Sequence, residues 1–179
     1  MEERNNINIV KKEDKHYPKQ LLQLADAPEV LYCIGDVRLL RKKCIAVVGS
    51  RKCSEYGKKV AMKIGKTAAE NGITVVSGMA KGIDCFAHLG ALQNGGDTIA
   101  VLGCGADICY PAANRNIYEE IREKGLLVSE EAPGMKPMPY MFPKRNRIIS
   151  GLAEAVAVVE AGTGSGALIT AELAAAQGR

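Results

Sequence analysis

The sequence predicts an α/β protein with a Rossmann-like fold: a doubly wound, mostly parallel sheet with helices on both faces. Short, almost wholly apolar segments alternate with longer segments of helical composition. Apolar strands separated by helices are typical of a parallel sheet that is buried on both faces. Glycine-bearing turns follow several of the apolar segments, at the strand ends where open α/β sheets bind ligands.

The expected elements follow in a regular order from residue 44. Strands are expected at residues 44–48, 73–78, 97–103, 126–130 and 155–161. Helices are expected at residues 54–71, from the turn after residue 78 to about 93, and at 115–124, 144–155 and 165–178. The proline-rich segment 132–143 is expected to be an irregular surface loop.

The length of 179 residues fits one domain, with residues 1–42 as a lead segment packed on a Rossmann-like core at 43–179. Because the chain stops directly after a helix, a C-terminal truncation is expected. No apolar run is long enough to span a bilayer, and the charged N-terminus has no signal core, which predicts a cytoplasmic protein. The six cysteines have no metal-ligand spacing, so no metal or other cofactor is expected.

The most informative segment is CIAVVGSRK at residues 44–52, where a buried strand turns into a helix. Such a turn presents free backbone N–H groups at the helix start, which can bind an anion. The hydroxyl of Ser50 and the guanidinium of Arg51 suit a phosphate oxygen. The alternative is that Gly49 only makes a tight turn.

Other ligand classes have weaker support. The first strand is not followed by the G-x-G-x-x-G pattern of dinucleotide sites, and no Walker A loop occurs. Neither His16 nor His88 has a nucleophile partner in a catalytic pattern, so a structural role is expected for His88.

Cations, in contrast, stand at several strand ends. A groove lined by them would suit a phosphate chain better than one small anion. Lysines 58, 59, 63 and 66 spread over a helix and are expected to be solvated surface charges. The net charge of +4 is compatible with a polyanion partner. The cations in question are Arg51, Lys52, Lys81, Arg115, Lys144, Arg145 and Arg147.

Five motifs together resemble the DprA/Smf family of DNA-processing proteins. They are GSR at 49–51, SGMAKGID at 77–84, AVLGCGADICYP at 100–111, FPKRNRIISGL at 142–152 and SGALITAELAAAQGR at 165–179. The lead segment 17–36 is also similar to the stretch that precedes the Rossmann core of that family.

The resemblance implies sequence-independent binding and protection of single-stranded DNA, with help in loading a RecA-type recombinase during DNA uptake in natural transformation and recombination. It implies no enzymatic activity. Phe142 is a candidate for stacking on a base, with a core or hinge role as the alternative. The phosphate-binding residues that it implies, taken with the cations above, are Gly49, Ser50, Arg51, Lys52, Ser77, Gly78, Lys81, Arg115, Arg145, Asn146, Arg147, Ser165 and Gly166.

The chain departs from the family pattern at three places. The charge that follows Tyr110-Pro111 is delayed to Arg115, and residues 161–165 read AGTGS without the usual arginine. The segments through which relatives pair as homodimers lie beyond residue 179. A nucleoside-monophosphate glycosidic hydrolase is the alternative function, with Glu160 or Glu172 as its catalytic carboxylate.

Overall fold

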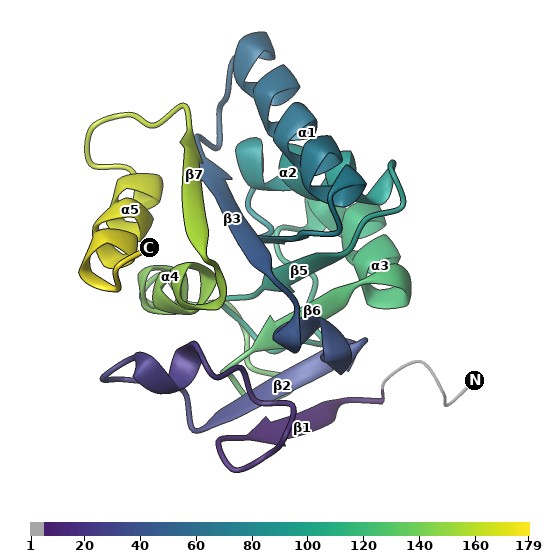
Figure 1. The fold of residues 1–179 in the computed structure, drawn as a ribbon, viewed down its shortest axis with the longest axis vertical. Helices are drawn as coiled ribbons and strands as arrows, with labels where there is room; N and C mark the ends of the chain where they lie inside the picture. The colour runs from purple at the N-terminus through teal and green to yellow at the C-terminus, as the bar shows by residue number, and fades with distance from the viewer. Residues whose placement is uncertain (1–5) are drawn as a thin grey trace.

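The computed structural model describes residues 6–179, so the first five residues of the predicted lead segment lie outside the described part. One seven-stranded sheet runs through the molecule in the order β1-β2-β6-β5-β4-β3-β7 (Figure 1). The five strands from β6 to β7 in this order are parallel, whereas β1 and β2 are antiparallel at one edge. The strands are β1 (Asn8–Lys11), β2 (Val30–Gly35), β3 (Cys44–Gly49), β4 (Thr74–Ser77), β5 (Thr98–Val101), β6 (Leu126–Ser129) and β7 (Ala155–Val159).

Helices cover both faces of the sheet, which confirms the predicted fold class. One face carries three α-helices and the other carries two, together with two short 3-10 helices from the lead segment. The first face has α1 (Glu55–Glu70), α2 (Ile83–Leu92) and α3 (Arg115–Lys124). The second face has α4 (Met141–Leu152), α5 (Gly166–Ala176), η2 (Leu21–Gln23) and η3 (Val37–Arg41), and η4 (Ala112–Asn114) precedes α3.

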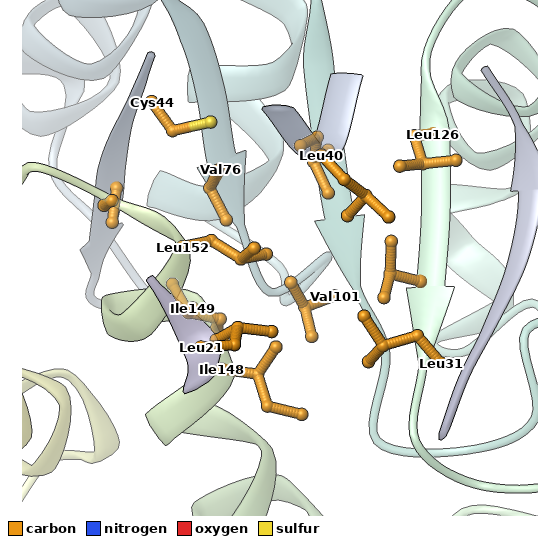
Figure 2. Packing of buried hydrophobic residues seen from close by; sticks show 14 of the residues in the cluster. Leu21, Leu31, Leu40, Cys44, Val76, Val101, Leu126, Ile148, Ile149 and Leu152 are labelled. Carbon is orange, nitrogen blue, oxygen red and sulfur yellow. The ribbon is translucent and has the colours of Figure 1, made fainter. Parts of the chain in front are cut away.

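Alternate residues of each strand supply the two core layers. Val76 and Val101 pack with Ile148 and Leu152 of α4, as Figure 2 shows, and Leu21 of the lead segment closes that layer. The neighbouring strand residues face α1, α2 and α3 instead. Because β4, β5 and β6 are buried on both faces, they read as continuous apolar runs, which is why the sequence located them. The antiparallel strands β1 and β2 of the lead segment were not predicted.

The predicted limits of α4 are wrong at both ends. The helix begins at Met141, three residues before the expected start, and Pro143 lies in its first turn. A proline fits there because its missing N–H would have no partner within the helix. Ala153 is already extended, with φ −97° and ψ 153°, so the helix ends at Leu152 and not at residue 155.

The direction of winding changes at β3. The chain passes from β3 through α1 to β4 on one side, whereas the later return through α4 places β7 on the other side of β3. Doubly wound sheets bind ligands at such a switch point, outside the carboxyl ends of the strands. Within residues 6–179, no helix combines the length and the apolar character that crossing a bilayer requires.

Candidate functional site

A cavity of about 810 Å³ opens at the switch point between β3 and β7. Its walls are the turn after β3, the first turns of α4 and the N-terminal turn of α5. Nine of the fourteen residues that the sequence predicted for the site line it: Gly49, Ser50, Arg51, Lys52, Phe142, Arg145, Asn146, Ser165 and Gly166.

The turn after β3 is held tightly in place. A Cβ at Gly49 would lie 1.9 Å from the carbonyl oxygen of Val159, so only glycine allows β3 and β7 to approach this closely. The Ser50 N–H donates to the carbonyl of Glu160 at 2.7 Å, and the Ser50 hydroxyl accepts from the Lys52 N–H at 3.2 Å. The turn therefore presents its next side chains from a rigid base.

Arg51 and Lys52 are exposed at the cavity wall. Among the described residues, neither side chain forms a hydrogen bond or an ion pair with the protein. An arginine guanidinium offers five donors in a planar fork, which fits phosphate oxygens. These two cations are therefore open to an anionic ligand.

Arg145 forms part of the cavity wall from the inside and is only 6% exposed. Its Nη1 donates to the carbonyls of Gly78, at 2.9 Å, and Val101. Burial lowers the pKa of Arg145 to about 10, an effect that the nearby Asp84 partly offsets. Burial likewise raises the pKa of Asp84, which accepts from the backbone N–H groups of Gly78 at 3.1 Å and Ala80 at 3.3 Å.

Gly78 is enclosed between these two charged groups. A Cβ at this position would lie 2.8 Å from Nη2 of Arg145 and 2.8 Å from Oδ2 of Asp84. Gly78 thus lets the arginine side chain cross the end of β4 and reach the cavity. Its role is to make room for Arg145 rather than to present its own N–H, which Asp84 already accepts.

Arg147 lies away from the cavity and is engaged inside the protein. Its guanidinium forms two hydrogen bonds to Glu130, both of 2.8 Å, and its Nε lies 2.7 Å from a carboxylate oxygen of Asp26. Lys144 pairs with Glu130 at 3.3 Å and with Glu131 at 3.2 Å. This ion cluster ties α4 to β6 and to the lead segment.

Three more predicted residues also lie outside the cavity. The Ser77 hydroxyl is buried and donates to the Val47 carbonyl at 2.6 Å. Arg115 is exposed on α3 with Glu119 at 3.6 Å. Lys81 is exposed next to Ala80, which does line the cavity, and makes no hydrogen bond or ion pair with any described residue.

The opposite wall is the start of α5. Its first backbone N–H groups have no acceptor within the helix, and the helix dipole places partial positive charge there. The Ser165 hydroxyl oxygen is buried and has no hydrogen-bond partner among the described residues. Asn146 donates to the Gly166 carbonyl at 3.2 Å and so ties this wall to α4.

Two aromatic rings complete the site. Tyr110 and Phe142 both line the cavity, with ring centroids 5.5 Å apart and planes inclined by 32°. A Cβ at Gly103 would lie 2.8 Å from the Phe142 ring, so the ring rests against this glycine. Tyr110 was not among the site residues predicted from the sequence, although its place after the third strand of the parallel core was a usable signal.

The carboxylates proposed for the alternative hydrolase are placed differently. Both oxygens of Glu160 accept from the Ser54 N–H, at 2.9 and 3.0 Å, and one accepts from its hydroxyl at 2.6 Å. Glu160 therefore holds the start of α1. Glu172 is exposed on α5 and does not line the cavity.

Taken together, the cavity offers free cations, unpaired N–H groups and an aromatic pair, a combination that suits phosphate and base at once. A family model described as DNA recombination-mediator protein A matches residues 8–179. The chain belongs to this family. The predicted resemblance to the DprA/Smf proteins is thereby confirmed.

Curated members of the DNA recombination-mediator protein A family are similar over almost the whole chain. The DNA processing protein DprA of Streptococcus pneumoniae is 48% identical over 166 residues, which are 93% of this chain and 58% of the relative. The protein Smf of Escherichia coli is 43% identical over 178 residues, which are 99% of this chain and 48% of the relative. The chain thus spans about half the length of these relatives.

Solved structures of family members have the same fold. The Streptococcus pneumoniae DprA structure superposes with a TM-score of 0.92 at 46% identity, covering 99% of this chain and 62% of the other. The Helicobacter pylori DNA processing protein A superposes with a TM-score of 0.88 at 32% identity, covering 97% and 79%. The latter structure concerns the single-stranded DNA binding mode of that protein.

Proposed function

We propose that the chain binds single-stranded DNA in the cavity at the switch point, without preference for base sequence. Arg51 and Lys52 contact backbone phosphates from one wall, and the Ser165 hydroxyl and the first N–H groups of α5 do so from the other. Phosphate contacts carry no sequence information, so all sequences bind with similar affinity.

The observation that carries this proposal is the pairing of free cations with an aromatic pair in one cavity. Arg51 is exposed and unpaired among the described residues, and the Tyr110 and Phe142 rings lie on the same cavity. Proteins that bind single strands combine a basic groove with aromatic rings on which bases stack. Stacked bases in a duplex do not offer their faces in this way, so the single strand is favoured.

A binding role also agrees better with the acidic groups than hydrolysis does. A glycosidic hydrolase needs a carboxylate that reaches the bond to be broken. Glu160 instead accepts three hydrogen bonds from Ser54, and Glu172 lies off the cavity. We therefore propose that the chain is not an enzyme.

The wider role that we propose is protection of single strands and assistance in loading a RecA-type recombinase onto them, in recombination and in DNA uptake during natural transformation. A cytoplasmic location and a homodimer belong to the same proposal. Its support is family membership, since the curated relatives carry the names DprA and Smf.

Fluorescence anisotropy of a labelled oligothymidylate, of mixed-sequence single strands and of a duplex, at two salt concentrations, tests the binding proposal. We expect salt-sensitive binding of all single strands with similar affinity and weaker binding of the duplex. A folded protein that binds none of them, or that releases free base from a nucleoside monophosphate, would refute the proposal.

A further inference from the structure

The turn after β3 and helix α1 together form a strongly basic segment. Residues 51–70, which are the turn after β3 and helix α1, contain six lysines or arginines and two glutamates, a net charge of +4. The whole chain also has a formal net charge of +4. This segment therefore carries a local excess of positive charge, which attracts a polyanion.

Helix α1 packs on the core with one face and carries its charged side chains on the opposite face. Its buried residues Gly57, Ala61, Gly65 and Ala68 face the molecule, and α2 packs so closely that a Cβ at Gly65 would lie 2.4 Å from the Ala87 carbonyl. The opposite face repeats at intervals of three and four residues, so its side chains form one line along the helix. That exposed line consists of Tyr56, Lys59, Lys63, Lys66 and Glu70.

The lysines of this line differ in what they contact. Lys66 pairs with Glu70 at 3.7 Å, and Lys58, at the side of the helix, pairs with Glu55 and lies over the Phe86 ring. Lys59 and Lys63 are exposed and form no hydrogen bond or ion pair with any residue in the range 6–179. They are available to an external anion.

Tyr56 stands at the cavity end of the line. Its residue is 77% exposed, the largest exposure among the large hydrophobic residues of the described chain. It lies in the first turn of α1, four residues after Lys52 of the cavity wall. An aromatic ring interleaved with unpaired cations is the composition of a surface that binds single-stranded nucleic acid.

We propose that the outer face of α1 is a second contact surface for the same single strand, which leaves the cavity past Arg51 and Lys52. Tyr56 stacks on a base, and Lys59 and Lys63 each contact a phosphate. From Tyr56 to Lys63 the helix rises about 10 Å. At about 3.4 Å per nucleotide of a stacked strand, this face binds roughly three nucleotides beyond those in the cavity.

The proposal rests on the proposed function and extends it to longer strands. An acidic protein surface is a weaker candidate for the same face, because it would use the lysines but not a ring that stacks on bases. The binding experiment distinguishes failure of the cavity proposal from failure of the α1 proposal. If the cavity binds no DNA, strands of every length bind weakly or not at all. If only the α1 face makes no contact, the variants on that face bind long strands as the parent does.

The test uses the full chain and labelled oligothymidylates of about 5 and about 25 nucleotides, titrated by anisotropy over a series of salt concentrations. A Lys59→Ala/Lys63→Ala variant should bind the short strand as the parent does. For the long strand, the negative slope of log K against log salt should become shallower by about 1.4, which corresponds to the loss of two phosphate contacts. Tyr56→Ser should bind the long strand at least about fivefold more weakly with no change of slope.

Lys43→Ala is the matched control. Lys43 is exposed immediately before β3, at the end of that strand opposite the cavity, and it also lacks an ion pair among the described residues. Its variant should keep the parent slope with both strands. The proposal is overturned if the lysine variant binds the long strand like the parent, or if Lys43→Ala lowers the slope as much. Equal weakening with short and long strands would also overturn it.

Discussion

Two arginines from the two basic motifs of the chain have opposite surroundings. Arg51, in the turn after β3, is exposed at the cavity and unpaired among the described residues. Arg147, in α4, is 7% exposed and forms ion pairs with Glu130 and Asp26. The same residue type therefore stabilises the structure at one position and is free for a ligand at the other.

The difference shows that one set of charged residues keeps the elements of the site in place, while another set is exposed to the ligand. The ion cluster of Arg147 fixes α4, and α4 carries Phe142 and Arg145 into the cavity. Substitutions in the cluster should act on the free energy of unfolding, whereas substitutions at the cavity surface should act on DNA affinity.

The largest expected effect is that of Arg147→Ala on stability. The change leaves the nearly buried Glu130 without its bidentate partner, and breaking a buried ion pair from one side costs about 3 kcal/mol. Chemical denaturation would measure this loss. Arg115→Ala, which removes only an exposed pair with Glu119, should cost less than about 1 kcal/mol. Equal losses in the two variants would show that Arg147 stabilises the fold no more than an exposed arginine does.

A second interior group gives the stability a pH dependence. Burial lowers the pKa of His88 to about 3, and its Nδ1 lies 2.6 Å from the Thr98 hydroxyl oxygen. The unfolded chain, with an ordinary histidine pKa of about 6.5, binds the extra proton below that pH. Stability contributed by neutral His88 is thus present above about pH 6.5 and is lost as the pH falls toward 3.

From pH 7 to pH 5 this linkage should lower the free energy of unfolding by about 2 kcal/mol. Denaturation at the two pH values measures the difference. The His88→Gln variant, which cannot titrate at this position, should have a lower free energy of unfolding at pH 7. Between pH 7 and pH 5 it should lose about 2 kcal/mol less than the parent does. An unchanged difference in this variant would show that other groups control the acid sensitivity.

Gly78→Ala tests the close packing beneath the cavity. The new Cβ would meet Nη2 of Arg145 and Oδ2 of Asp84, each at 2.8 Å, and overpacking of this kind costs about 1–3 kcal/mol. Thermal unfolding would report the loss. Gly162→Ala is the control, because no heavy atom lies within 4 Å of its added Cβ, and its stability should change by less than about 0.5 kcal/mol.

Phe142→Leu should separate stacking from packing. Leucine keeps an apolar side chain against Gly103 but has no ring face, and loss of a stacked base weakens binding by about 1–3 kcal/mol. Anisotropy with oligothymidylate should show weaker binding with the parent's salt slope, because no phosphate contact is removed. Unchanged affinity would exclude stacking on Phe142.

The sequence predicted the fold well because parallel strands buried on both faces are apolar throughout, as in residues 44–48. It also located the turn at Gly49 to Lys52, where strand, glycine and cations are consecutive. The sequence could not show that Arg145 lines the cavity whereas Arg147 belongs to an internal ion cluster. Their neighbours, Val101 and Asp84 for the one and Glu130 and Asp26 for the other, are distant in sequence.

The sequence singled out Phe142 but missed its pairing with Tyr110, and it also missed the limits of α4. Tyr110 and Phe142 lie 32 positions apart, and only the folded chain brings their rings to 5.5 Å. Proline-rich composition predicted a loop up to Pro143, but the first turn of a helix accepts proline.

The most direct measurement is the salt dependence of oligonucleotide binding by Arg51→Ala beside the parent. We predict that the negative slope of log K against log salt becomes shallower by about 0.7, the value of one phosphate contact. The affinities for oligothymidylate and for mixed sequences should decrease by the same factor. A variant with the parent's slope and affinity would contradict the account, because Arg51 would then be a solvated charge and not part of a DNA site.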